Sequence, residues 1–280
     1  MIVNTDNDIQ EQMVNIISAE QDSVFHRLDV DNIVVELPKN PSQGKGVWVN
    51  IKYKYQDGKV DKLRIQTSEL FSFGVSKYEE SSPPKMCFSM TNKKQRESLA
   101  NGEDLSEEEK MNISVEDGTI DILDKICEKV RNAMKDSEMI KALGKGRDKK
   151  WVSKVDGMEI VKRKENDNGI ESAYVYAKIV TDANFMKTRF YQKEEEGVTE
   201  LNSQETIDKL SKKGTNCKVI ANIVVDSVFV GKDPHIQVKL SEAVINEYVE
   251  FGSKCSIVMP KRSRGKKETS AQRLKICDSG

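Results

Sequence analysis

The stretch CKVIANIVVDSVFVGKDPHIQVKLSEAVI, which spans Cys217–Ile245, is typical of two β-strands joined by a turn. Residues 217–230 are rich in valine and isoleucine, which fit the surface of a pleated sheet. The turn sequence GKDP follows at Gly231–Pro234, and residues 235–245 begin with alternating apolar and polar side chains. This alternation turns Lys239 away from the core. The stretch therefore predicts a chain in which strands dominate.

A hairpin is predicted upstream in VWVNIKYKYQDGKVDKLRIQT, which covers residues 47–67. A three-residue loop at Gln56–Gly58, with its glycine left-handed, pairs Ile51 with Leu63 and gathers apolar partners on one face. A two-residue loop would instead pair Ile51 with Arg64 and mix polar with apolar side chains. We therefore expect the register that the three-residue loop sets.

This register gives the other face of the hairpin a cationic character. It places Lys52 beside Lys62 and Asn50 beside Arg64. Directly opposed lysines mildly destabilise a sheet. A bound polyanion would relieve that cost, and water and salt would relieve part of it.

Weaker patterns locate the other elements. An amphipathic stripe predicts a short helix at residues 6–20, and apolar residues at every fourth position predict a helix from Thr119 to about residue 136. Residues 92–118 are polar and acidic, and we interpret them as a mobile insertion. Further strands are expected at residues 31–37, 85–91, 158–164, 172–180 and 186–192, with a short helix at 205–211.

Charge is segregated along the chain, although the formal net charge is only −1. Residues 1–36 carry a net charge of −7 and residues 97–124 one of −9, whereas residues 141–164 carry +6 and residues 254–275 carry +7. A single charged run is often just a solvated face. Four alternating blocks suit a protein with a polyanion-binding face, whose acidic segments compete for that face or recruit a partner.

Three parts are expected from this organisation. Residues 1–30 form an acidic arm with a helix, residues 31–250 form the main domain with an acidic insertion and a helix at about 92–150, and residues 251–280 form a basic tail. The tail is too poor in apolar residues to fold alone, so we expect it to be disordered in isolation. The fold class is mainly β with an inserted helix.

Several classes of protein are excluded by missing motifs. Five cysteines without a CxxC pair disfavour a disulfide scaffold or zinc ribbon and favour an intracellular setting. No apolar run is long enough to span a membrane, and the first residues do not resemble a secretory signal. There is no GxxxxGK[ST], GxSxG or HExxH, and His26 and His235 lack metal-ligand spacing. We therefore expect neither catalysis nor a cofactor.

Aromatic and basic side chains recur together on predicted strand faces. The residues concerned are Tyr174, Tyr176 and Lys178 in YVYAKIV, Arg189 and Tyr191 in KTRFYQK, and Lys149, Lys150 and Trp151 in KKW. Flat rings stack on unpaired bases without reading their sequence, and cations follow the phosphates. Each tyrosine alone could simply be half-buried at a sheet edge, but the set favours a face that binds single-stranded nucleic acid.

Several blocks of sequence resemble a known family in their order and spacing. They are LRIQTSELFSFGVSKY (Leu63–Tyr78), KKWVSK (Lys149–Lys154), YVYAKI, TRFY and the stretch Cys217–Ile245. Across roughly residues 31–250 they resemble the single-stranded-DNA-binding proteins of large nucleocytoplasmic DNA viruses, relatives of the T-odd phage single-strand-binding protein. The resemblance implies an OB-type antiparallel β-barrel with an inserted helix, and no catalysis. It also implies that the protein coats exposed DNA strands in replication or recombination.

The resemblance further implies which residues line the DNA groove. They would be Lys149, Lys150, Trp151, Tyr174, Tyr176, Lys178, Arg189 and Tyr191, extended to Lys52, Lys62, Arg64, Lys218 and Lys239. The phage protein ends in an acidic tail that contacts replication partners and competes with DNA, whereas this chain ends in a basic one. Either the acidic role lies in residues 97–124, or such regulation is absent.

Two functions are therefore carried forward. The leading hypothesis is a non-sequence-specific single-stranded DNA-binding protein of a large DNA virus, active in the virus factory or nucleus of the infected cell, with replication proteins as partners through its acidic segments. The alternative is a structural protein of the virion or nucleoid that reuses the barrel and grips DNA through its basic tail. Oligomeric state stays open, because a helix at 6–20 would also suit a homodimer contact.

Overall fold

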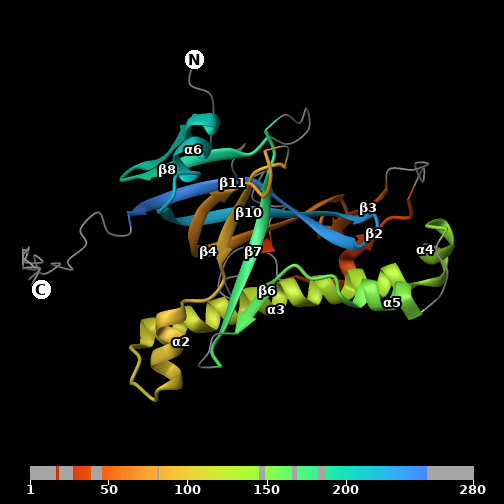
Figure 1. Cartoon of the computed structure of the whole chain (residues 1–280), viewed down its shortest axis with the longest axis horizontal. Helices are drawn as coiled ribbons and strands as arrows, with labels where there is room; N and C mark the ends of the chain where they lie inside the picture. The colour runs from red at the N-terminus through yellow and green to blue at the C-terminus, as the bar shows by residue number, and fades with distance from the viewer. Residues whose placement is uncertain are drawn as a thin grey trace, which may run out of the picture.

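The structure is a computed structural model that describes residues 17–18, 28–38, 46–80, 82–144, 149–165, 169–181 and 187–250. Within these ranges the protein is mainly β, with several helices (Figure 1). This confirms the fold class expected from the alternating strand patterns and the long periodic helix.

Within the described residues, eleven strands form one hydrogen-bonded sheet. They are β1 (Ile17–Ser18), β2 (Ile33–Val35), β3 (Val47–Lys54), β4 (Val60–Ser76), β5 (Lys85–Ser89), β6 (Lys162–Glu165), β7 (Glu171–Ile179), β8 (Arg189–Glu194), β9 (Gly197–Leu201), β10 (Thr215–Val230) and β11 (Pro234–Glu250). The predicted strands are present with shifted ends, and the one expected at 158–164 is confined to β6. Sequence reasoning did not predict β9.

Five of these strands close into a ring. β10 pairs with β4, β4 with β5, β5 with β7, β7 with β11, and β11 returns to β10. The β7–β11 pair is parallel and joins Lys178 to Lys239, and β8 also lies parallel to β11. The wholly antiparallel arrangement expected from the sequence is therefore wrong. With its 17 residues, β11 is long enough to pair with both β7 and β8.

The predicted register of the first hairpin is confirmed at its turn. Lys52 lies opposite Lys62, and the loop glycine has a φ of 81°, in the left-handed region that glycine tolerates best. Further from the turn the hairpin opens, and β10 enters between β3 and β4. Asn50 consequently pairs with Ser227 of β10, so the expected pair of Asn50 with Arg64 is wrong. The long apolar strand β10 therefore forms backbone hydrogen bonds with both strands of the hairpin.

The helices occupy much of the segment expected to be mobile. They are α2 (Lys93–Ala100), α3 (Glu107–Lys135), α4 (Ser137–Ala142), α5 (Lys149–Asp156) and α6 (Ser203–Leu210), with a 3-10 turn, η1 (Val30–Asn32). The interpretation of residues 92–118 as a mobile insertion is therefore wrong. Ser106 and Glu109 form a capping box, and glutamates fill the first turn of α3, where the helix dipole favours negative charge.

The apolar face of α3 joins the helices to the sheet. Leu123, Ile126, Val130 and Met134 are buried in the same hydrophobic core as the strands and Trp151. In Figure 1, α3 runs along one side of the sheet, with α2 near one end and α4 and α5 near the other. The packing thus leaves α2 and the first turns of α3 as an arm beside the sheet.

The expected terminal parts lie mostly outside the described residues. This applies to the helix at 6–20 within the arm 1–30, and to the tail 251–280. Ile17–Ser18 form β1, which lies parallel to Ile65–Gln66 of β4, so a helix running through them is wrong. Their backbone groups extend the sheet instead. In the ranges that the structure covers, no helix is long and apolar enough to cross a membrane.

Candidate nucleic-acid interface

A row of aromatic and basic side chains crosses the outer face of the ring. Successive strands place Lys162 of β6, Tyr174 of β7, Ser89 of β5, Phe71 of β4 and Lys218 of β10 at directly paired positions. Directly paired residues point to the same face of a sheet. Tyr174 and Lys218, two of the residues predicted from sequence to bind DNA, therefore lie on one surface.

Phe73 adds a further ring to this row. Its ring centroid lies 5.1 Å from that of Phe71 and 5.9 Å from that of Tyr174, and the residue is 50% exposed. The register of β4 is irregular around this position. The irregularity needs Gly74, which has a φ of 80° and where a Cβ would lie 2.4 Å from the carbonyl oxygen of Leu210. The backbone thus holds an exposed cluster of rings in place.

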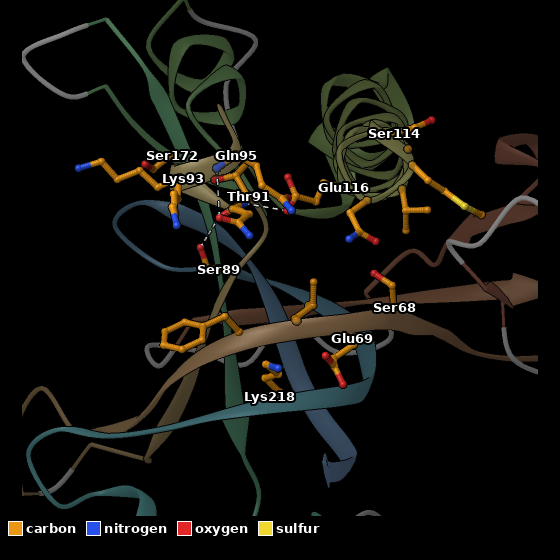
Figure 2. Close-up of a pocket in the computed structure, with 18 of the residues that line it drawn as sticks. Ser68, Glu69, Ser89, Thr91, Lys93, Gln95, Ser114, Glu116, Ser172 and Lys218 are labelled. Atoms are coloured by element: carbon orange, nitrogen blue, oxygen red, sulfur yellow. Dashed lines mark hydrogen bonds between the residues drawn. The ribbon is translucent and has the colours of Figure 1, made fainter. Parts of the chain in front are cut away.

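An open groove with a volume of about 1020 Å³ lies over these rings. The sheet forms one wall, and α2 with the first turns of α3 forms the other (Figure 2). Lys93 and Lys94 of α2 line the groove together with Lys218 of β10, and so do the acidic residues Glu69, Glu108 and Glu116. We call this site the aromatic groove. It combines flat apolar rings with cations from two separate elements, α2 and β10.

An ion-pair network fixes α2 against α3 at the edge of this groove. The Arg96 guanidinium donates to the Glu116 carboxylate at 3.0 Å and to the Asp117 carboxylate at 2.7 Å. Glu116 also accepts a hydrogen bond of 2.7 Å from the backbone N–H of Asn92, the N-cap residue of α2. Burial raises the pKa of the Glu116 carboxyl despite the guanidinium beside it. We call Arg96, Glu116 and Asp117 the α2 latch.

Tyr176 and Lys178 continue the outer face of β7. Tyr176 lies opposite Cys87 of β5, and Lys178 lies between Lys85 of β5 and Lys239 of β11. Burial, followed by the effect of the Cys87 thiol, raises the pKa of Tyr176 to about 12, so its hydroxyl stays protonated at neutral pH. This part of the face therefore offers a neutral ring beside a row of three lysines.

Arg189 and Tyr191 lie on β8, which is separated from β7 by β11. Arg189 forms an ion pair with Glu242 of β11, and its guanidinium carbon lies 5.9 Å from the centroid of the Tyr191 ring. Neither residue is among those that line the aromatic groove. The structure therefore does not bring this pair to the cluster around Tyr174.

The expectation that Trp151 offers a stacking surface is wrong. The residue lies in α5, is only 5% exposed, and donates its indole N–H to the backbone carbonyl of Met134 at 3.3 Å. Helical spacing puts Trp151 and Val155 on the buried face of α5. Lys149 and Lys150 are exposed at the start of this helix, which lies at the other end of α3 from α2 (Figure 1).

The other five nominated cations lie on the outer face of the sheet, and three of them form ion pairs with acidic residues. Lys52 pairs with Glu36 at 2.7 Å, Lys218 with Glu247 at 3.0 Å, and Lys239 with Asp226 at 2.6 Å. Lys62 lies opposite Lys52, and Arg64 follows on the same face of β4. Only Lys218 among these five lines the aromatic groove.

Sequence reasoning missed Phe71, Phe73, Lys93 and Lys94. The two phenylalanines stand in the block FSFG, where period-2 alternation would have placed both rings on one strand face. The lysines directly follow Asn92, a typical N-cap residue that marks the start of α2. Nothing in the neighbouring sequence indicated that these lysines would lie near the sheet.

Fold and groove together define a mainly β protein with several helices and an exposed aromatic and basic face. The chain belongs to the family described as "Protein of unknown function (DUF2738)", whose sequence profile matches residues 35–275. No curated protein matches the chain.

Among solved structures, the chain is similar to "Single-stranded DNA-binding protein from bacteriophage Enc34 in complex with ssDNA". The identity is 15% and the TM-score 0.37, over 76% of this chain and 97% of that chain. A second structure, "Single-stranded DNA-binding protein from bacteriophage Enc34", is similar at 15% identity and a TM-score of 0.35, over 77% of this chain and 93% of that chain.

Proposed function

We propose that the protein binds single-stranded DNA without sequence preference in the aromatic groove. The observation that supports this most is the contact of exposed Phe73 with Phe71 and Tyr174, across a groove that Lys93 and Lys94 also line. Each base stacked on an aromatic ring contributes roughly 1–3 kcal/mol, and lysines follow the phosphates. Duplex DNA hides the faces of its bases, so exposed rings favour single strands.

The closed ring of strands supports an OB-type barrel as the scaffold. An OB fold is a five-stranded, partly open barrel that binds oligonucleotides on the face of its second and third strands. Counted along the chain within the ring, those two strands are β5 and β7. They carry Lys85, Tyr174, Tyr176 and Lys178 on the outer face. Tyr174 also lines the aromatic groove, so the groove overlaps the binding face expected of an OB-type barrel.

Ion pairs on this face do not oppose DNA binding strongly. Lys218 contacts Glu247 at 3.0 Å, and both side chains are about half exposed. Exposed pairs of this kind contribute roughly 0–1 kcal/mol, so a phosphate can replace the carboxylate at small cost. Lys85 and Lys178 add positive charge along the same face, and Lys93 adds it from the α2 wall of the groove.

The biological role that we propose is coating of exposed strands during DNA replication or recombination of a large DNA virus, inside the infected cell. The resemblance of the sequence blocks to viral single-stranded DNA-binding proteins supports this setting. An OB-type barrel with a sequence-tolerant groove is suited to such coating.

A binding titration tests the proposed function directly. Fluorescence anisotropy of labelled oligothymidine, the matching duplex and an RNA of equal length is measured at two or more salt concentrations. We expect single strands to bind more tightly than duplex, and affinity to fall steeply with salt because phosphate contacts release counterions. Equal affinity for duplex, or binding that salt does not weaken, would contradict the proposal.

A further inference from the structure

A second aromatic row lies near the turn between β10 and β11. Trp48 of β3, Phe229 of β10 and His235 of β11 occupy directly paired positions. The ring centroids of Trp48 and Phe229 are 4.7 Å apart, and those of Phe229 and His235 are 5.3 Å apart. Trp48 is 51% exposed, whereas its neighbour Val49 faces the core and is fully buried. These rings lie on the outer face of the sheet.

The backbone approaches the Phe229 ring closely at two glycines, Gly46 and Gly231. A Cβ at Gly46 would lie 2.5 Å from Cζ of Phe229, and one at Gly231 would lie 2.8 Å from its Cε1. Side chains at either position would therefore push the ring away. The two glycines leave room for the Phe229 ring, which packs against the Trp48 indole and holds it at the surface.

Cations share this face with the rings. Lys52 lies four residues after Trp48 on β3, so both side chains point to the same side of the sheet. Arg64 of β4 and Lys239 of β11 both pair with Val224 of β10 on this side. Lys52 and Lys239 are paired with carboxylates, but such pairs contribute little at a partly exposed surface. Arg64 adds a further positive charge at a partly buried position of β4.

We propose that this surface, which we call the Trp48 platform, is a second stacking site for a base of the same DNA strand. The inference rests on the proposed function. Strand β10 connects the two sites, because Lys218 lines the aromatic groove and Phe229 belongs to the platform. The irregularity between Val225 and Ser227 brings both residues to the outer face. Eleven positions of extended strand span about 36 Å.

This distance determines which DNA can occupy both sites. OB folds contact roughly 4–16 nucleotides, so a strand of about 5 nucleotides fills one site, whereas one of about 20 nucleotides reaches both. The linked contacts raise the affinity of the long strand, because the second site binds it at a high effective concentration. The platform therefore predicts a strong dependence of affinity on strand length.

The two tryptophans of the chain provide a selective readout. Trp48 is exposed and Trp151 is 5% exposed, so bases that stack on the platform quench Trp48 alone. Titration with oligothymidine of about 20 nucleotides is expected to quench the wild-type emission and leave that of Trp48→Phe unchanged. Trp48→Ala is expected to bind the long strand roughly 5- to 150-fold more weakly and Trp48→Phe much less so, because phenylalanine keeps a stacking ring. Val198→Ala, which shortens another exposed apolar side chain on β9, is the matched control.

The outcomes separate the inference from the function on which it rests. Failure of the wild type to bind any single strand removes the proposed function. Normal binding of the long strand by Trp48→Ala, or wild-type binding without quenching, overturns the platform alone. The same holds if Trp48→Ala leaves DNA binding intact but abolishes self-association in sedimentation, because the surface is then a protein interface.

Discussion

At the scale of single residues, the two kinds of side chain in the aromatic groove make separable contributions. Phe73 is held by Gly74 and by contacts with two other rings, so it is arranged before any ligand arrives. Lys93 and Lys94 contribute charge from the opposite wall. Stacking is nearly independent of salt, whereas phosphate contacts release counterions, and this difference allows each to be measured.

Replacing Phe73 with alanine removes the most exposed ring of the groove. We expect roughly 5- to 150-fold weaker binding of oligothymidine, because one stacking contact is lost. The slope of log affinity against log salt is expected to stay at the wild-type value, as measured by anisotropy over a salt series. Wild-type affinity in this variant would show that bases do not stack in the groove, and Val198→Ala again controls for loss of an exposed apolar side chain.

Replacing both Lys93 and Lys94 with glutamine removes two positive charges from the α2 wall. We expect the salt slope to become shallower by about 1.4, because each phosphate contact on a single strand contributes about 0.7. The same salt series measures this change. An unchanged slope would mean that α2 does not contact the phosphates; Lys149→Gln with Lys150→Gln, which removes the same charge from α5, is the control.

At the scale of elements, the α2 latch decides where Lys93 and Lys94 stand. Arg96 and Glu116 are both largely buried, with side chains 21% and 15% exposed, and they join α2 to α3 across the wall of the groove. Hydrogen bonds to charged groups contribute roughly 1.5–3 kcal/mol. Loss of the charge on Glu116 should therefore loosen α2 while the buried face of α3 holds.

Glu116→Gln tests the latch with a side chain of the same shape. We expect backbone amides of residues 93–100 to exchange hydrogen faster, with those of residues 119–134 unchanged. The salt slope of DNA binding should fall toward that of the double lysine variant, and Glu116→Gln should have no further effect in that double variant. Lys129→Gln breaks the 3.1 Å ion pair of α3 with Asp31 and is the matched control. Independent, additive effects would show that the latch does not position the lysines.

At the scale of the whole molecule, the described residues form the sheet, the helical arm and both aromatic clusters, and the basic residues 254–275 follow them in the chain. We expect removal of residues 251–280 to lower affinity modestly and to flatten the salt slope, because the segment has a net charge of +7 from Lys254 to Lys275. The preference for single strands over duplex should persist in a competition titration. Loss of most binding would instead favour a protein that grips DNA through its tail.

Much of the local structure was predictable from neighbouring residues. The alternation in Cys217–Ile245 and the turn at Gln56–Gly58 predicted strands and a register that the structure confirms near the loop. The apolar stripe after Thr119 predicted the buried face of α3. The start of α3 was missed although Ser106 and Glu109 have capping-box spacing, because the acidic composition was interpreted as mobility.

The sequence alone determined which side chains share a face of one strand, because side chains alternate along a strand. Tyr174, Tyr176 and Lys178 are an example. Neighbours in space were not readable, because they depend on pairing between segments far apart in the chain. Insertion of β10 into the first hairpin carried Arg64 and Trp48 to one sheet surface, and β11 separated Arg189 from the groove. Packing of α5 against α3 buried Trp151, and the α2 latch brought Lys93 to the groove that the rings of β4 line. Both outcomes depend on contacts between distant segments, which outweigh the structural preferences of neighbouring residues.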